Sequence, residues 1–283
     1  MTDTAVIGPI AAPGLHVMSY NIRRRMPQLF ARSPDRWVHR RPLLKRLLED
    51  EQPTLLSAQE ALPQQAKFVR HALGEHYRSI GYGRDANRRG EAAPIFYDSR
   101  RLRLLDWKQT ALSDTPNVPG STSWGNHTPR LVVTASFRDL ATDIQFQAVN
   151  THLDNFSRTA RLHSADVLRR IVSATTLPSI VTGDFNTDAE TSPYHELTGH
   201  GLLVDSWHSA EERLSEVWGT FLNYRPPKLE RKRIDWILTT PSVTVLSAAI
   251  NVTRYKGGWP SDHAAVQAVL NLGNSTGAHP LEP

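Results

Sequence analysis

The chain has 283 residues, of which 39% are hydrophobic and 22% are charged, and this composition excludes an intrinsically disordered protein. The absence of cysteine excludes disulfides, thiolate metal ligands and a cysteine nucleophile. The 33 lysines and arginines outnumber the 28 acidic residues, and the formal net charge of +5 favours anionic partners.

Short apolar runs alternate with amphipathic stretches along the sequence. The first strand is predicted at residues 15–20, and a helix at 36–51 carries its leucines on one face. A strand at 55–59 and a helix at 63–73, with Pro63 in its first turn, come next. The later elements, in chain order, are strands at 94–97, 102–107, 131–137 and 144–150, a helix at 157–174, and strands at 179–182, 234–238, 243–251 and 264–270. Many strands with a few interspersed helices predict an α/β or α+β fold with helices outside the sheets.

The chain contains no internal repeat, no low-complexity block and no linker between two compositions, which favours a single domain. We expect this domain at residues 15–272, with flexible tails at 1–14 and 273–283. The longest uncharged stretch, residues 236–253, contains Pro241 and many hydroxyl side chains, so we expect no membrane span. The first residues lack the basic start of a secretory signal, which together with the absence of cysteine predicts a cytoplasmic protein. We expect a monomer.

Polar side chains stand at the ends of the predicted strands, where they are poorly placed for core packing and well placed for a site at which several strands converge. These residues are Asn21, Glu60, Asn150, His152, Asp184, Asn186, Asp235, Asp262 and His263. Carboxylates, amides and histidines without cysteine form a set of hard ligands, which suits Mg²⁺ or Mn²⁺ rather than a closed Zn²⁺ site.

Each of these residues also has a structural explanation when it is taken alone. Asp184 and Asp262 follow small residues in segments that are typical of turns. Glu60 lies just before the helix predicted at 63–73 and could cap it. His152 could be a buried histidine whose nitrogens are hydrogen-bonded. The grouping of these residue types, rather than any single one, favours a functional site.

The ordered series MSYNI (18–22), QE (59–60), NTHL (150–153), GDFN (183–186), RIDWIL (233–238) and SDH (261–263) resembles the endonuclease/exonuclease/phosphatase family, which includes deoxyribonucleases, abasic-site endonucleases, sphingomyelinases, inositol polyphosphate 5-phosphatases and deadenylases. The resemblance extends over nearly the whole chain. It implies a deoxyribonuclease-like four-layer sandwich, in which two mixed β-sheets are flanked by helices and the site lies at one end of the sheets.

The resemblance also implies a role for each polar residue of the series. The metal would be held by Glu60, Asn21 and Asp262. The catalytic residues would be His152, Asp184, Asn186, Asp235 and His263, with Asp184 orienting or deprotonating a water and Asp235 holding His263 against the phosphoryl oxygens. Which residue is the general base, and whether one or two ions bind, stays open at this stage.

Two arginines are further candidates for binding phosphate. Arg130 enters a central strand in a Thr-Pro-Arg segment that resembles the family pattern. Arg84 lies in a glycine-, arginine- and glutamate-rich block at residues 83–101 that resembles a block found in many bacterial members. The same block could instead be a hairpin loop with a solvated charged tip, and this alternative stays open.

The predicted function is that of a divalent-metal-dependent phosphoesterase that uses Mg²⁺ or Mn²⁺. Basic residues are dense at 23–46, 84–103 and 228–233, which favours a nuclease-like phosphodiesterase acting on nucleic acid or another phosphate ester. One alternative is a phosphomonoesterase acting on a sugar, nucleotide or lipid phosphate. The other is a catalytically silent member that binds nucleic acid. The absence of a Gly-x-Ser-x-Gly turn disfavours a serine hydrolase.

Overall fold

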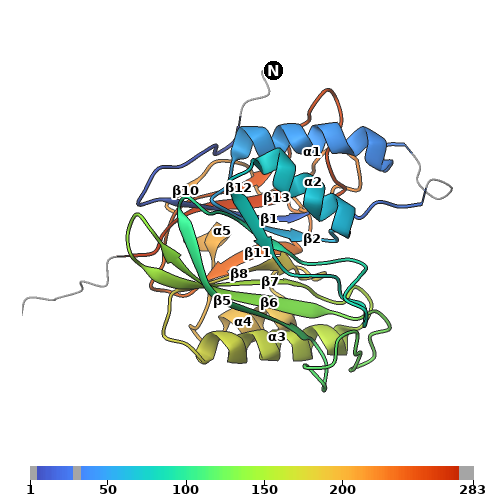
Figure 1. The fold of residues 1–283 in the computed structure, drawn as a ribbon, viewed down its shortest axis with the longest axis vertical. Helices are drawn as coiled ribbons and strands as arrows, with labels where there is room; N and C mark the ends of the chain where they lie inside the picture. The colour runs from blue at the N-terminus through green and yellow to red at the C-terminus, as the bar shows by residue number, and fades with distance from the viewer. Residues whose placement is uncertain (1–4, 28–32, 274–283) are drawn as a thin grey trace, which may run out of the picture.

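The computed structural model describes residues 5–27 and 33–273, and these form two β-sheets packed face to face with helices on both outer faces (Figure 1). The four layers predicted from the sequence are therefore present. Residues 1–4, 28–32 and 274–283 are not described, so part of the basic run at 23–46 and most of the expected C-terminal tail lie outside the described residues.

The first sheet is built around two strands that are buried along their whole length, polar residues such as His16 and Ser57 included. The central strand β1 pairs in parallel with β2 and antiparallel with β13, so the sheet is mixed. Its strand order is β10 (Glu212–Arg213), β12 (Thr244–Asn251), β13 (Ala265–Asn271), β1 (Leu15–Asn21), β2 (Leu55–Gln59), β4 (Ile95–Asp98) and β3 (Tyr77–Ile80).

In the second sheet, two neighbouring parallel strands end side by side. Its strand order is β5 (Leu102–Ala111), β6 (Leu131–Asp139), β7 (Gln145–His152), β8 (Ser179–Asp184), β11 (Asp235–Thr239) and β9 (Val204–Asp205). In the parallel pair of β7 and β8, His152 lies opposite Asp184 at the carboxyl ends of both strands. Asp184 also lies opposite Asp235 in the antiparallel pair of β8 and β11, so the first residue of β11 joins that edge.

The helices cover the outer faces of the sheets. Helices α1 (Trp37–Glu51) and α2 (Pro63–Leu73) lie on the first sheet, and α3 (Arg158–Ser173) and α4 (Ser192–Thr198) lie on the second (Figure 1). The short α5 (Ser206–Ser209) packs beside β12. Ser157 caps α3 by accepting a hydrogen bond from the N–H of Ala160, which explains where the amphipathic stretch starts. One apolar core fills the space between the sheets, and separate cores lie under each helical layer.

Several elements were not among those predicted because their sequence patterns are short or polar. The strand β3 has only four residues, two of them exposed. The helices α4 and α5 are shorter than two helical turns, and the strands β9 and β10 are too short to show an alternating pattern. The strand β5 extends to Ala111, beyond the predicted end at residue 107. It is an edge strand with many partly exposed residues, so its sequence lacks the apolar pattern from which its end could be predicted.

The described part of the segment expected as an N-terminal tail is anchored on the domain. The Glu51 carboxylate, buried at the end of α1, accepts hydrogen bonds from the backbone N–H groups of Val6 (2.7 Å), Ile7 (3.2 Å) and Gly8 (3.0 Å). A buried carboxylate needs such donors, and the tail segment supplies them. No helix in the described part of the chain has the length and apolar character needed to cross a bilayer.

A buried amide joins the two sheets directly beneath the strand ends. The Asn150 side chain on β7 donates to the carbonyl oxygens of Ala58 (2.9 Å) and Ala93 (3.0 Å), and its Oδ1 accepts from the Gln59 side chain at 2.9 Å. Since Asn150 and His152 lie on one strand, and Gln59 precedes Glu60, this link fixes the distance between the polar residues of the two sheets.

Candidate active site

The polar residues at the strand ends come together at one edge of the sandwich. Asn21 is the last residue of β1, Glu60 directly follows β2, and His152 and Asp184 end β7 and β8. Asp235 opens β11, which runs antiparallel to β8, so it reaches the same edge. Together with His263, the topology gathers residues that are up to 242 positions apart in the chain.

Asn21 lies at the centre of this cluster. Its Nδ2 donates to Glu60 Oε1 at 3.1 Å and to Asp184 Oδ2 at 2.9 Å, and lies 3.5 Å from Nε2 of His263. Its Oδ1 accepts from the Arg23 N–H at 3.0 Å. The Ser261 hydroxyl donates to the Asn21 carbonyl oxygen at 2.6 Å and so joins the loop that carries His263 to β1. One amide thus links side chains from both sheets.

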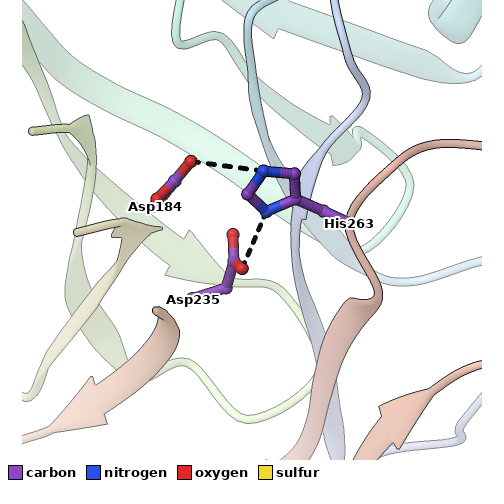
Figure 2. A group of neighbouring side chains, drawn as sticks. All are labelled: Asp184, Asp235 and His263. Carbon is purple, nitrogen blue, oxygen red and sulfur yellow. Dashed lines mark hydrogen bonds and ion pairs between the residues drawn. The ribbon is translucent and has the colours of Figure 1, made fainter. Parts of the chain in front are cut away.

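His263 and Asp235 form a buried ion pair, with Nδ1 and Oδ2 separated by 2.9 Å (Figure 2). The other ring nitrogen of His263 faces Asp184 Oδ2 at 3.7 Å. Burial alone would lower the pKa of His263, but the charges of Asp235 and Asp184 outweigh it and hold that pKa well above its usual value. The imidazole is therefore cationic at neutral pH.

Asp184 has the opposite electrostatic character. Burial, followed by the neighbouring Asp235 charge, raises the pKa of Asp184 to about 7, although His263 and the Asn21 amide act against this rise. Its Oδ1 accepts the backbone N–H of Asn186 at 2.9 Å. A carboxylate with a pKa near neutrality can accept and release a proton under working conditions.

The backbone before β11 is held by a threonine. The Thr220 hydroxyl accepts the N–H groups of Ile234 at 2.9 Å and Asp235 at 3.2 Å. Asp235 itself keeps one buried carboxylate oxygen, Oδ1, without a hydrogen-bond partner among the described residues. Its other oxygen, Oδ2, is bonded to His263.

Glu60 and Asp262 form the acidic side of the cluster. Glu60 has a left-handed backbone with φ of 59°, and its Oε2 accepts the Arg24 N–H at 3.0 Å. Burial would raise the pKa of Glu60, but the Arg24 N–H and the Asn21 amide outweigh it and lower that pKa. The Arg23 guanidinium faces both carboxylates, at 3.8 Å from Glu60 and 3.5 Å from Asp262.

His152 faces the same centre from the second sheet, with Nε2 at 3.5 Å from Asp184 Oδ2. Burial, reinforced by the positive charges of Arg130 and Arg84, holds the pKa of His152 well below its usual value, so its imidazole is neutral. Arg84, Arg130 and His152 line one small cavity together with Glu60 and Glu91. Arg84 pairs with Glu91 at 2.9 Å at the base of the charged block at 83–101, and both residues face the cavity. Residues 85–89 of the same block are exposed and form a loop tip closed by backbone hydrogen bonds, so the block combines an inward-facing base with a solvated charged tip.

Asn186 lies beside Asp184, but its side chain is bonded to the protein. Its Nδ2 donates to the Leu153 carbonyl oxygen at 3.0 Å, and its φ of 51° is left-handed. The structure therefore brings all ten predicted site residues to one edge of the sandwich, with Asn186 positioned through its backbone.

The donor chemistry of this cluster fits a divalent cation. The buried Asp262 and the partly exposed Glu60 face a shared positive group, and carboxylate oxygens are the ligands that Mg²⁺ and Mn²⁺ prefer. A second set, Asp184, Asp235 and His263, also has ligand atoms within 4.8 Å of one another. In that set His263 is cationic and bonded to Asp235, so it fits a hydrogen-bonding role better than ligation.

An open cleft of about 430 Å³ borders the cluster on one side, and the exposed ring of Phe221 lies at its mouth, 5.1 Å from the ring of His263. Basic side chains line the cleft: Arg225, Lys228, Arg231 and Lys232. This volume falls within the range of roughly 300–1,000 Å³ that small-molecule sites occupy. The cleft can therefore accommodate the part of a substrate that extends away from the reacting group.

Sequence reasoning did not single out three residues that position the site. These are Arg24, Ser261 and Asp154, the last of which pairs with Arg130 at 3.4 Å. Ser261 and Asp154 stand inside or next to the quoted motifs, and this adjacency was the only available signal. Their roles depend on backbone contacts with distant segments, which the chain order does not reveal.

Comparison with known proteins identifies the family. The model of the endonuclease/exonuclease/phosphatase family matches residues 18–263. The chain belongs to this family. A family protein from Bacteroides vulgatus is 31% identical, with a TM-score of 0.85 over 92% of this chain and 99% of its own. A mannosyl-6-phosphatase from Bacteroides thetaiotaomicron is 30% identical, with a TM-score of 0.84 over 90% of this chain and 99% of its own.

This chain is also similar to a viral protein. An uncharacterized protein of Acanthamoeba polyphaga mimivirus is 29% identical over 222 residues, which is 73% of this chain and 76% of that protein. The family consists of phosphoesterases, and the expected deoxyribonuclease-like sandwich is confirmed.

Proposed function

We propose that this protein is a divalent-metal-dependent phosphoesterase that hydrolyses a phosphate ester of a small molecule with an activated water. The observation that carries the proposal is the Asn21 amide, which bonds Glu60 at 3.1 Å and Asp184 at 2.9 Å and so joins the acidic and the histidine sides of one cluster. The 30% identity to a mannosyl-6-phosphatase over nearly all of that protein supports a phosphomonoester as the substrate class.

His263 is the group that meets the negative charge of the reacting phosphate. Its imidazole is cationic because Asp235 lies 2.9 Å away, and a fixed positive donor stabilises the charge that builds on the phosphoryl oxygens. Asp184 accepts the proton of the attacking water. A pKa of about 7 places this carboxylate where a general base works best near neutral pH.

Glu60, Asp262 and Asn21 are the residues that would hold the metal ion, either Mg²⁺ or Mn²⁺. When bound, such an ion supplies Lewis-acid charge and orients the phosphate. The Arg23 guanidinium, which faces both carboxylates, supports this assignment because it marks a place where the protein favours positive charge.

His152, Arg130 and Arg84 form the opposite wall and contact the phosphate. The neutral His152 donates an N–H hydrogen bond, and the two guanidinium groups supply charge. Asn186 holds Asp184 through its backbone N–H and acts as a positioning residue.

A nuclease-like phosphodiesterase is the second candidate, and one observation favours it. Four basic side chains, Arg225, Lys228, Arg231 and Lys232, line the cleft next to His263, and such a row suits a polyanionic strand. A catalytically silent member that binds nucleic acid is disfavoured, because every polar position of the family pattern carries a side chain able to act.

The test is a substrate panel with Mg²⁺, with Mn²⁺ and with EDTA. The panel contains p-nitrophenyl phosphate, mannose 6-phosphate, bis-p-nitrophenyl phosphate, single-stranded DNA and RNA. We expect turnover of monoesters that stops with EDTA and falls about 10²-fold or more in Asp184→Asn. Asp143→Asn, a change at an exposed carboxylate, is the matched control. Exclusive cleavage of DNA or RNA would favour the second candidate, and turnover that resists EDTA would contradict the metal requirement.

A further inference from the structure

A second cavity lies behind the two arginines of the active-site wall. It has a volume of about 130 Å³ and is lined by Arg84, Arg88 and Arg130 together with Tyr82 and Gln109. Arg84 and Arg130 also line the small cavity that contains Glu60 and His152. The two arginines therefore form a wall between this arginine pocket and the reaction centre.

The arginine pocket carries an excess of positive charge. Arg84 is paired with Glu91 at 2.9 Å and Arg130 with Asp154 at 3.4 Å, whereas no carboxylate pairs with Arg88 among the described residues. Glu91 is shared, because Arg24 also reaches it at 3.4 Å. None of the described residues that line the pocket is acidic. Three guanidinium groups around one small pocket create a positive potential that attracts an anion.

Arg130 has a donor that is not used by the protein. The residue is 5% exposed, and its buried Nη1 has no hydrogen-bond partner among the described residues. The protein therefore compensates the charge of Arg130 incompletely, which adds to the positive potential around the pocket. Arg88 is exposed on the same loop tip as Arg89, but its guanidinium lies over the Tyr82 ring at 4.6 Å and so stays beside the pocket.

The walls of the pocket are fixed by backbone contacts. Gln109 bonds both the N–H of Tyr82, at 2.9 Å, and its carbonyl oxygen, at 3.1 Å. At Gly120 (φ of 78°) an added Cβ would lie 2.5 Å from the Ala86 nitrogen, so a glycine is needed where the two loops approach. The pocket is thus a built feature of the fold.

We infer that the arginine pocket binds a second anionic group of the substrate, a phosphate that is not hydrolysed, so that the substrate class is a small bisphosphorylated molecule. The inference rests on the proposed function, because the first phosphate must lie on the Glu60 and His152 side of the shared wall. The volume of about 130 Å³ suits one small group, since pockets for whole drug-sized ligands begin at roughly 300 Å³.

The test measures binding of inorganic phosphate to the full chain by isothermal titration calorimetry in EDTA. We expect saturable binding whose Kd rises about tenfold in Arg88→Gln and is largely restored in Arg88→Lys. Arg89→Gln, which removes the same charge from an exposed neighbour outside the pocket, should leave the Kd unchanged. Circular dichroism melts of each variant verify that it is folded.

A kinetic arm uses mannose 1,6-bisphosphate and mannose 6-phosphate. Arg88→Gln should lower the ratio of kcat/KM for the bisphosphate to that for the monophosphate about tenfold, and Arg89→Gln should not. The inference would be overturned if phosphate did not bind, or if Arg88→Gln and Arg89→Gln weakened phosphate binding equally. Turnover on the substrate panel would in that case still support the proposed function. Phosphate binding that depends on Arg88 in a protein without any turnover would leave the pocket in place and overturn the proposed function instead.

Discussion

Replacing Asp235 by asparagine removes the charge that keeps His263 cationic while conserving the shape of the side chain. Asp235 is 1% exposed and its Oδ2 lies 2.9 Å from Nδ1 of His263. An opposite charge at this distance shifts a pKa by about one to three units, which is equivalent to about 1.4–4 kcal/mol of preference for the charged imidazole. We therefore expect the pKa of His263 to fall by that amount in Asp235→Asn.

The sign of the effect on activity follows from the charge. His263 acts as a cation, and its raised pKa keeps it charged up to the high end of the pH range. The activity on the alkaline side of the pH–rate profile falls as His263 loses its proton. In Asp235→Asn this fall should therefore occur at a lower pH than in the wild type. At pH 7.5 the rate should fall about 10²–10⁴-fold, because a stabilising charge and an oriented donor are both lost.

The assay is an NMR titration of the histidine ring nitrogens in the wild type and the variant, alongside the pH dependence of kcat. Asp139→Asn is the control, because it removes a buried carboxylate that pairs with Arg101 at the opposite end of the second sheet. It should lower stability without changing the pKa of His263. An unchanged pKa of His263 in Asp235→Asn would refute the electrostatic reasoning.

Two further changes test the fold on which the site depends. Burial lowers the pKa of His16 to about 4, so as pH falls from about 6.5 toward 4 the unfolded chain takes up this proton before the folded chain does, and the folded state loses stability. Urea unfolding should show that His16→Gln removes up to about 3 kcal/mol of this decline in stability. An identical decline in the wild type and the variant would contradict this reasoning. Asn150→Ala removes the link between the sheets and takes from the Gln59 amide the shortest of its three hydrogen bonds. The free energy of unfolding should fall by about 3 kcal/mol, whereas a loss below about 0.5 kcal/mol would show that the link is dispensable.

The main architecture was accessible from the sequence because its central strands are fully buried. β1 and β2 are short segments rich in apolar residues, and the amphipathic stripe of α3 begins at its capping serine. Strands such as β9 and β10, with two residues each, carry no pattern of their own. They form only because a neighbouring strand offers hydrogen bonds, which is a tertiary effect.

The site residues could be predicted by type and by their place at strand ends, but not their contacts. Nothing in the order of the motifs indicates that one amide, Asn21, bonds both Glu60 and Asp184. The anchoring of residues 6–8 by Glu51 spans more than 40 positions and was equally hidden. The arginine pocket depends on two loops that meet at Gly120, a contact that exists only in the folded chain.

The central claim is that the cluster around Asn21 uses a metal held by Glu60 to hydrolyse a phosphate ester. The most direct measurement is the initial rate of phosphate release from a monoester over a titration of Mg²⁺, for the wild type, Glu60→Gln and the exposed control Asp143→Asn. We expect a saturable dependence on Mg²⁺ in the wild type and the control, and a rate about 10²-fold lower in Glu60→Gln. A rate that is independent of Mg²⁺, or that is unchanged in Glu60→Gln, would contradict the claim.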